Sequence, residues 1–356
     1  MKINHNYFLN LAFNLAKINL GKTKENPSVG CVVVKNKSVI SSSCTSMNGR
    51  PHAEYVALNK DISFNKSYLY VTMEPCTHYG LTPPCANIIK KKGIKKVFYA
   101  FDDVDKRTAK KSKRYFTKNK IKIYKKKITK FKNFYKSYIK NKVEDLPYID
   151  AKIAISKDYF SINKKYKWIT NSLSRSRAHL IRSEYDSIIS TSKSINKDNS
   201  LLNCRINGYD NRKPDLIIID LNLRIRKNLR LFKLPKNRKI LIITTIKNSK
   251  KIIFLRKKGI KFIIINTLKE KNDFIFLFKV LKKKGYNRIL IEAGLNFLNE
   301  LLTNKLVSNL FIFKSLKKLG KNGKNNCSIN YIKKLKLSKK INVNLDGDQL
   351  YKVIIK

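Results

Sequence analysis

The chain has 356 residues, more than one domain usually holds, so its length predicts two hydrophobic cores. Hydrophobic residues make up 42% and charged residues 29%, which excludes a disordered chain, and the lack of a long uncharged apolar run excludes a membrane-spanning protein. The 79 Lys and Arg residues against 23 Asp and Glu give a net charge of +56, a value typical of nucleic-acid-binding proteins.

This positive charge is spread along the chain rather than gathered in one segment. Residues 1–145 carry a net +22, from 31 basic and 9 acidic residues, and the remaining 211 residues carry +34. A nucleic-acid footprint is a patch or a stripe, whereas these lysines accompany Asn, Ile and Phe everywhere, as a compositional bias would produce. We therefore interpret the excess lysines as solvated surface residues and expect neither a nucleic-acid nor a membrane partner.

Helical and strand-like segments alternate through the first part of the chain. Apolar residues from Phe8 to Ala16 recur on one helical stripe, which Gly21 closes. Strands are predicted at residues 29–34, 68–72 and 97–101, and helices near His52 and near Cys85. A basic amphipathic helix is predicted from residue 128 to about residue 142, because its apolar residues recur at three- and four-residue steps. The alternation is typical of an α/β sandwich around one sheet.

The acidic, proline-containing segment Val143–Pro147 is the predicted linker and gives a domain boundary near residue 145. The alternation then resumes. Strands are predicted at residues 148–156, 188–191, 216–220, 240–245, 262–265 and 288–291, and helices at 171–182, 273–284 and 296–304. We therefore expect two α/β domains, residues 1–145 and 146–356.

The six cysteines show no disulfide-framework spacing. The start of the chain has no apolar export segment, so we expect a reducing, cytoplasmic location, where paired cysteines are more often metal-binding or catalytic. Cys76 and Cys85 form such a pair. Cys85 follows two prolines and opens a predicted helix, whose N-terminus favours the thiolate form.

A catalytic zinc site is predicted from His52, Cys76 and Cys85. Pro51 suits a helix start and brings His52 and Glu54 into a first helical turn, while Cys76 follows a predicted strand. One His and two Cys supply three zinc ligands and leave the fourth tetrahedral position for water, as in catalytic sites. Glu54 stands two residues from a ligand and can move protons. H-x-E followed by P-C-x-x-C marks zinc-dependent base deaminases; this chain has H-A-E and P-C, but eight residues rather than two separate Cys76 from Cys85. Hydrolytic deamination is the reaction that this set suits.

Each of these residues also has an ordinary structural interpretation. A lone His is usually a satisfied residue, two Cys are often buried thiols, and a helical Glu is usually solvated. A purely structural zinc site, with His78 as the fourth ligand, remains the main alternative. It leaves Glu54 without a role, and for this reason we favour catalysis.

Three motifs resemble one family, the bifunctional riboflavin-biosynthesis enzymes that fuse a pyrimidine deaminase to a reductase. They are N-P-S-V-G-C at Asn26–Cys31, G-R-P-H-A-E at Gly49–Glu54, and the long loop E-P-C-T-H-Y-G-L-T-P-P-C at Glu74–Cys85. The resemblance implies that His52, Cys76 and Cys85 bind Zn²⁺ and that Glu54 is the catalytic proton shuttle. It implies deamination of a diaminopyrimidinone ribosyl phosphate, a small-molecule substrate. A departure occurs where the family's Asp-Pro-Asn-Pro segment reads Asp102–Asp105 and its following glycines are lost.

The resemblance continues through the second half, from Pro147 to the turn at Gly294, in the order of the family's reductase. It implies a cytidine-deaminase-like three-layer domain followed by a dihydrofolate-reductase-like domain, which reduces the ribosyl group to a ribityl group with NADPH. No G-x-G-x-x-G motif is present, but a strand, a glycine and a helix follow one another at Gly294, where backbone N–H groups can face an anion. The implied NADPH contacts are Ala154, Trp168, Ser194, Asp198, Gly294, Leu295 and Asn296.

The resemblance also implies a substrate site in the reductase. Arg182 and Arg205 are expected at its phosphate end, because the planar guanidinium can pair two phosphate oxygens, and Leu202 and Glu292 beside its sugar. The family's Ser-x-Asp-Gly-basic turn reads Ser156–Phe160 here, with aromatic residues in place of the glycine and the charge.

Two other functions remain open from the residues alone: a zinc-dependent nucleic-acid base deaminase that uses the positive charge, and a zinc-stabilised RNA-binding protein without catalysis. We favour the bifunctional enzyme, acting as a homo-oligomer.

Overall fold

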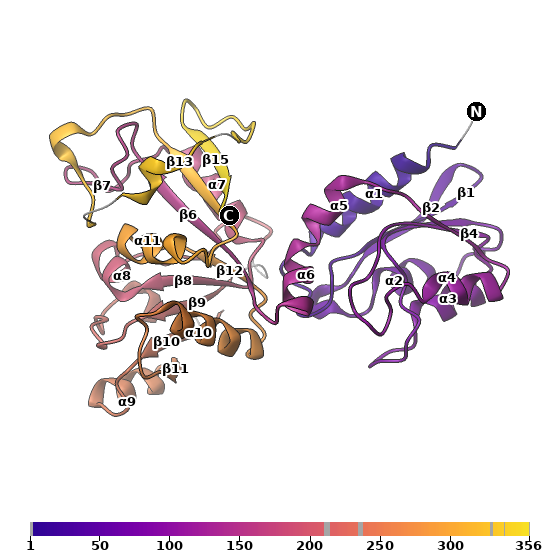
Figure 1. Cartoon of the computed structure of the whole chain (residues 1–356), viewed down its shortest axis with the longest axis horizontal. Coiled ribbons are helices and arrows are strands. Elements are labelled where there is room, and N and C mark those ends of the chain that lie inside the picture. Colours follow the sequence, from indigo (N-terminus) through magenta and orange to yellow (C-terminus); the bar gives the residue numbers. More distant parts are fainter. Residues whose placement is uncertain (1–2, 210–213, 234–237, 328–329, 338, 356) are drawn as a thin grey trace. The chain divides into compact units, whose positions relative to one another are not determined.

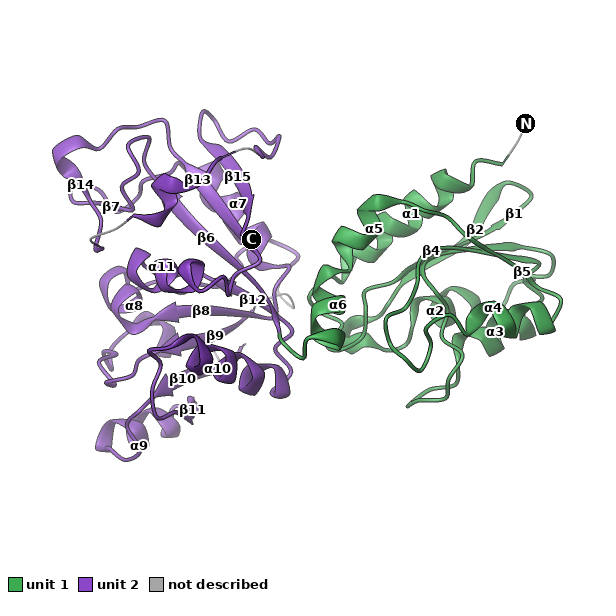
Figure 2. Ribbon diagram, in the orientation of Figure 1, with its two compact units in different colours: residues 1–146 green, residues 147–356 purple. Residues whose placement is uncertain are grey.

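Two separate β-sheets organise the chain in the computed structural model, which describes residues 3–209, 214–233, 238–327, 330–337 and 339–355. The chain divides into two units, Met1–Leu146 and Pro147–Lys356 (Figure 2). The division falls within the acidic, proline-containing segment that the sequence analysis singled out. Each unit has its own sheet and core and is described by itself.

The first unit is built on a five-stranded sheet with the order β2-β1-β3-β4-β5. Its strands are β1 (Gly30–Lys35), β2 (Ser38–Cys44), β3 (Tyr68–Met73), β4 (Lys96–Phe101) and β5 (Lys122–Lys125). The strand β1 runs antiparallel to β2 and β3, whereas β3, β4 and β5 are parallel. The three predicted strands are confirmed as β1, β3 and β4, and β2 and β5 extend the sheet at its two edges.

Helices cover both faces of this sheet. They are α1 (His5–Ile18), α2 (Ala53–Leu58), α3 (Cys85–Lys91), α4 (Ser112–Lys118), α5 (Thr129–Phe134) and α6 (Lys136–Val143), with a short 3-10 turn η1 (Met47–Gly49). Figure 1 shows α1 and α5 on one face and α2, α3 and α4 on the other. The single basic helix predicted after residue 128 is instead two helices, which meet at Tyr135. The Tyr135 side chain is fully buried, and its hydroxyl hydrogen-bonds with Thr72 on β3.

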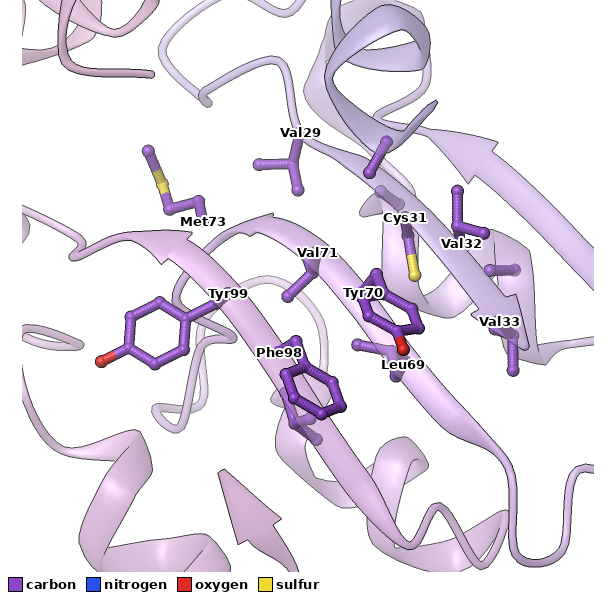
Figure 3. Close-up of a cluster of buried hydrophobic side chains, with 14 of the residues drawn as sticks. Val29, Cys31, Val32, Val33, Leu69, Tyr70, Val71, Met73, Phe98 and Tyr99 are labelled. Carbon is purple, nitrogen blue, oxygen red and sulfur yellow. The ribbon is translucent and has the colours of Figure 1, made fainter. Parts of the chain in front are cut away.

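The core of the first unit lies between the sheet and its helices. Figure 3 shows apolar side chains from β1, β3 and β4 packed together, among them Cys31, Tyr70 and Phe98. The helix α1 approaches β1 so closely that a Cβ at Gly30 would lie 1.8 Å from the carbonyl oxygen of Ala12. Only glycine fits there, and this contact sets the distance between α1 and the sheet.

An eight-stranded sheet with the order β11-β10-β9-β8-β12-β6-β13-β15 forms the second unit. Its strands are β6 (Tyr148–Ile155), β8 (Ser187–Thr191), β9 (Asp215–Ile219), β10 (Ile240–Thr244), β11 (Lys261–Ile264), β12 (Arg288–Ile291), β13 (Asn309–Lys314) and β15 (Gln349–Ile354). Neighbouring strands are parallel, except that β15 is antiparallel to β13. The six predicted strands are confirmed, and β13 and β15 are additional.

The helices of the second unit agree with the prediction where a prediction was made. They are α7 (Ser172–Arg182), α8 (Ser192–Asp198), α9 (Lys250–Lys257), α10 (Lys271–Lys283) and α11 (Leu295–Thr303), with 3-10 turns η3 (Arg230–Phe232), η4 (Gly320–Asn322) and η5 (Tyr331–Lys334). The helices α7, α10 and α11 were expected. Caps fix several helix starts: the side chain of Asn171 accepts the Ser174 N–H at 2.9 Å. Within the described residues, no helix is long and apolar enough to cross a bilayer.

A small two-stranded sheet follows the turn Ser156–Phe160, in which this chain departs from the family pattern. The strand β7 (Ile162–Asn163) pairs with β14 (Gly323–Lys324). Asp158 accepts backbone N–H groups from Leu319 at 3.1 Å and Gly320 at 2.9 Å. A Cβ at Gly323 would lie 2.1 Å from the ring of Phe160. The Phe160 ring of this turn therefore fits because Gly323, more than 160 residues later in the chain, has no side chain.

Candidate active sites

The donor atoms of His52, Cys76 and Cys85 converge in the first unit. His52 is the N-cap residue of α2, Cys85 is the first residue of α3, and Cys76 follows β3. The Nδ1 atom of His52 lies 3.7 Å from Cys76 Sγ and 3.4 Å from Cys85 Sγ, and the three donor atoms all lie within 4.8 Å of one another. The helix α2 begins at Ala53 rather than at Pro51, so the imidazole extends from the residue before the helix.

The spacing of these donors fits zinc. With Zn–S distances near 2.3 Å and Zn–N distances near 2.0 Å, a tetrahedral ion separates a nitrogen from a sulfur by about 3.5 Å. The two observed N···S distances, 3.7 and 3.4 Å, lie on either side of this value. The other ring nitrogen, Nε2, is buried without a hydrogen-bond partner among the described residues, so the imidazole presents Nδ1 to the thiols.

His78 does not belong to this group. Its Nδ1 lies 2.9 Å from the hydroxyl of Thr108, and the group of possible metal donors in the described part of the chain contains three residues, His52, Cys76 and Cys85. A closed four-ligand site that includes His78 therefore has no support in the arrangement. The three-donor set is that of a site with an open position.

The segment around Cys85 folds over Cys76. Pro84 precedes α3 with φ −61°, and the backbone N–H of Cys85 donates to Cys76 Sγ at 3.2 Å. A hydrogen bond from the Cys85 thiol, then one with His52 and this backbone bond, outweigh burial and lower the pKa of Cys76 to about 4. The same thiol bond, together with burial, raises the pKa of Cys85. The two thiols therefore interact directly with each other.

Glu54 lies in the first turn of α2 with only 4% of its surface exposed. Burial is the largest influence on its carboxyl group, and the nearby Cys76 adds to it, so that the pKa of Glu54 rises to about 7. A carboxyl group with a pKa near neutrality can both accept and return a proton. Glu54, His52 and Cys76 line one pocket.

A loop after β4 also lines this pocket and brings in residues that sequence reasoning did not assign. Asp103, Asp105, Arg107 and Tyr138 line the pocket, the last from α6. The Tyr138 hydroxyl donates to Asp103 Oδ1 at 2.8 Å. The helical periodicity of α6 marked Tyr138 as an apolar packing residue, and its hydroxyl gave no separate signal.

Glu74 holds this loop in place. Its buried carboxylate accepts the backbone N–H groups of Asp103, Lys110 and Ser112 at 3.3, 3.1 and 3.2 Å, and the Ser112 hydroxyl at 2.7 Å. Because Glu74 is two residues from Cys76, one strand end carries both a metal donor and the support of the pocket wall. The motif E-P-C contained Glu74, but nothing local indicated partners about thirty or more residues away.

In the second unit, the predicted substrate residues Arg182 and Glu292 bind each other. Arg182 Nε and Nη2 donate to the two carboxylate oxygens of Glu292 at 2.5 and 2.9 Å, and Lys152 Nζ lies 3.2 Å from Oε2. Burial would raise the pKa of Glu292, but the charges of Arg182 and Lys152 outweigh it and lower the pKa to about 2. Two of the five N–H donors of Arg182 are thus occupied by Glu292.

Arg205 and Leu202 lie on the loop after α8, beside this ion pair. The Arg205 side chain is exposed, and its backbone N–H donates to His179 Nδ1 at 3.2 Å. Leu202 has a positive φ of 48°, and its carbonyl accepts from Arg238 Nη1 at 2.7 Å. Burial, followed by the charges of Arg182 and Arg205, lowers the pKa of His179 to about 4 and keeps the imidazole neutral at neutral pH.

The residues expected to contact NADPH are brought together only in part. Gly294 N–H donates to Ser194 Oγ at 3.2 Å, and a Cβ at Gly294 would still lie 3.6 Å from this atom. Leu295 and Asn296 begin α11, whose first turn contains no acidic residue, so its N–H groups suit a phosphate. Asp198 ends α8, Ala154 lies on β6, and Trp168 is 55% exposed with the Arg175 guanidinium 4.9 Å from its ring centroid. In the described ranges, no side-chain hydrogen bond joins these three residues to the Ser194–Gly294 pair.

Two family models match the chain, one in each unit. The model described as the cytidine and deoxycytidylate deaminase zinc-binding region matches residues 2–101, and the model described as the RibD C-terminal domain matches residues 147–349. These matches confirm the predicted fold class, a cytidine-deaminase-like domain followed by a dihydrofolate-reductase-like domain.

Whole-length relatives show the same pairing of domains. The chain is 30% identical to the riboflavin biosynthesis protein RibD of Haemophilus influenzae, over 92% of this chain and 90% of that protein. It is 26% identical to RibD of Escherichia coli, over 92% of each. A solved structure of Acinetobacter baumannii RibD, 26% identical, superposes with a TM-score of 0.83 over 99% of each chain.

Proposed function

The chain belongs to the RibD family of riboflavin-biosynthesis enzymes, in which a deaminase is fused to a reductase, and we propose the residues and substrates with which it performs these two reactions. The observation that carries the proposal is the convergence of His52 Nδ1 with the Cys76 and Cys85 sulfurs beside the buried carboxyl group of Glu54. The reductase half contributes a buried Arg182–Glu292 pair and an open helix N-terminus at Gly294.

In the deaminase, His52, Cys76 and Cys85 would hold zinc, which supplies the Lewis acidity that activates water for attack on the pyrimidine ring. Glu54 accepts a proton from that water and returns one to the departing amine. Its place in the pocket lining and its pKa near 7 support both transfers. The substrate is a diaminopyrimidinone ribosyl phosphate, and the products are ammonia and the corresponding uracil derivative.

In the reductase, NADPH delivers hydride to the opened ribose of that product, and positioning of the two reactants supplies most of the rate. Ser194 and the N–H groups at Leu295 and Asn296 bind the cofactor's phosphates, with Gly294, Ala154, Trp168 and Asp198 as further contacts. This assignment rests on the Ser194–Gly294 hydrogen bond and on the resemblance to the family.

Arg205, Arg182, Leu202 and Glu292 form the substrate site of the reductase. Because Arg182 already binds Glu292 with two of its N–H groups, Arg205 carries the larger share of the phosphate contact. Glu292 remains ionised and oriented by Arg182 and Lys152, so it accepts hydrogen bonds from sugar hydroxyls.

We also propose that the enzyme acts as a homo-oligomer on small molecules in the cytoplasm. The support for this compartment is chemical: the deaminase needs Cys76 and Cys85 reduced in order to bind the metal.

A mass-based assay tests the proposed function. The purified chain is incubated with the diaminopyrimidinone ribosyl phosphate, with and without NADPH. Deamination releases ammonia and gives a product about 1 Da heavier than the substrate. Reduction adds about 2 Da more, and only when NADPH is present. An unchanged substrate mass after zinc loading would refute the deaminase assignment.

The variant Glu54→Gln separates the proton shuttle from the metal site. It should retain zinc and lose ammonia release, because the amide cannot carry the proton. Glu25→Gln, an exposed residue of the same unit, serves as the control with unchanged activity. Persistent ammonia release by Glu54→Gln would show that another group moves the proton.

A further inference from the structure

Arg50 is a positive charge on the wall of the deaminase pocket that no carboxylate neutralises. The pocket is lined by two further long cationic side chains, Arg107 and Lys142. Arg107 holds Asp105 with Nε at 3.0 Å and Nη2 at 2.6 Å, and Lys142 Nζ lies 3.7 Å from the same carboxylate. In the part of the chain that the structure describes, Arg50 forms no ion pair.

The guanidinium of Arg50 is held in a fixed place rather than left in solvent. Its Nη1 donates to Thr82 Oγ1 at 2.6 Å, and Thr82 belongs to the long loop between Cys76 and Cys85. A Cβ at Gly80 would lie 3.8 Å from Arg50 Nη2, which shows that the group lies along this loop. One N–H is used by Thr82, and the planar fork offers five, so donors remain for an anion.

The proposed substrate needs such a group. Its phosphate is attached to the ribose, at the far end of the molecule from the amino group that leaves, so the phosphate must be recognised away from Glu54. The pocket is also lined by Asp103 and Asp105, whose charges repel a phosphate. Arg50 is the pocket cation on the side of the metal-binding loop, and Arg binds phosphate oxygens in pairs.

We propose that Arg50 binds the substrate's phosphate and makes the deaminase selective for the phosphorylated pyrimidine riboside over the unphosphorylated one. This inference rests on the proposed deaminase function and names the residue that sets its substrate class. Thr82 orients the guanidinium, and the loop that supplies two metal donors thereby also fixes the phosphate contact.

The test compares two substrates, the ribosyl phosphate and the riboside obtained from it with a phosphatase, on the zinc-loaded full chain. Arg50→Gln should raise KM for the phosphorylated substrate by about 10- to 100-fold, because it removes a charge-assisted contact. The KM and kcat for the riboside should stay within about twofold of the parent protein. Arg50→Lys should give an intermediate KM, since a point charge replaces the fork.

Inorganic phosphate gives a second measurement: it should compete with the phosphorylated substrate in the parent protein and not in Arg50→Gln. Arg114→Gln, an exposed arginine on α4, is the matched control and should behave as the parent. Equal losses on both substrates, or unchanged phosphate inhibition in Arg50→Gln, would overturn the assignment.

The outcome of the test also distinguishes the inference from the function on which it rests. If the parent protein releases ammonia from neither substrate, the proposed deaminase function fails. In that case, calorimetry measures the affinity of the phosphorylated substrate for the parent protein and for Arg50→Gln, independently of catalysis. Equal affinities would show that Arg50 does not bind the phosphate.

Discussion

Arg182 and Glu292 form a bidentate ion pair inside the second unit, with Arg182 Nε 2.5 Å from Oε1 and Nη2 2.9 Å from Oε2. Both side chains are almost completely buried. The pair joins α7 to the residue that follows β12. It therefore fixes the orientation of Glu292 in the proposed substrate site and contributes to the stability of the unit.

Removing one partner of this pair should destabilise the second unit strongly. Arg182→Leu leaves a buried carboxylate without its partner, and we expect the free energy of unfolding to fall by about 3–5 kcal/mol. Urea denaturation followed by fluorescence measures the change. The exposed pair between Lys140 and Glu144 is the control, since Lys140→Gln should cost about 0.5 kcal/mol or less. Similar losses of unfolding free energy in the two variants would show that the buried pair stabilises the protein no more than the exposed one.

The stability of the second unit should depend on the ionisation of Glu292. Its pKa is about 2 in the folded protein and near 4.5 when unfolded, so its contribution is complete above about pH 4.5 and is lost as pH falls toward 2. The contribution is on the order of 3 kcal/mol. Unfolding free energies of the parent and of Glu292→Gln should therefore converge between pH 5 and about pH 2. A constant gap over this range would contradict the assignment.

Glu74 should affect substrate binding without affecting the metal. In Glu74→Gln the amide nitrogen cannot accept the N–H groups that the carboxylate holds, so the loop carrying Asp103 and Asp105 shifts. We expect kcat/KM for deamination to fall by about 10- to 100-fold, mainly because KM rises. The zinc content should stay at about one ion per chain. Glu144→Gln, on an exposed side chain, should have no such effect. Loss of zinc in Glu74→Gln would indicate a role in the metal site instead.

Removal of the metal should separate the two activities. The donors His52, Cys76 and Cys85 all belong to the first unit, so a chelator should abolish ammonia release and leave the NADPH-dependent reduction of the deaminated substrate intact. Added zinc should restore deamination. Cys85→Ser should reproduce the effect of the chelator, and Cys44→Ser, on β2 outside the donor group, should not. Parallel loss of both activities would contradict this separation.

The packing of Gly323 against Phe160 can be measured with a double-mutant cycle. Gly323→Ala places a methyl group where the Phe160 ring lies, and we expect a loss of about 1–3 kcal/mol in the stability of the second unit. In the background of Phe160→Ala the same substitution should cost much less. An additive cycle would mean that the two residues do not interact.

The strands that could be predicted from the sequence are those with unbroken apolar and β-branched residues, such as β1 and β9. The strand β2, Ser38–Cys44, contains four serine residues and lies at the sheet edge, so neither composition nor alternation marks it. The strand β13 has a clear apolar run, Leu310–Phe313, but it lies beyond the helix predicted to end at residue 304 and was not predicted. The basic helix breaks at Tyr135, whose hydroxyl contacts Thr72 on β3, a long-range contact that no local pattern contains.

The metal donors and Glu54 could be predicted because their chemistry is local, in short motifs with fixed spacing. The residues that complete the pocket could not, because their partners are distant in the sequence. Glu74 acts on Ser112, and the Arg50 side chain reaches Thr82. In the second unit, the sequence placed Arg182 and Glu292 in one site but could not show that they bind each other.

The loop that Glu74 supports contains a left-handed backbone position occupied by lysine rather than glycine. Lys110 has a φ of 60°, a left-handed conformation that usually favours glycine, and its side chain is exposed. Its N–H is fixed by the Glu74 carboxylate, so an anchored acceptor compensates for the conformational cost of a side chain at this position. A polypeptide rich in Lys and Asn can thus keep a left-handed turn without glycine, as long as the Glu74 carboxylate that anchors it persists.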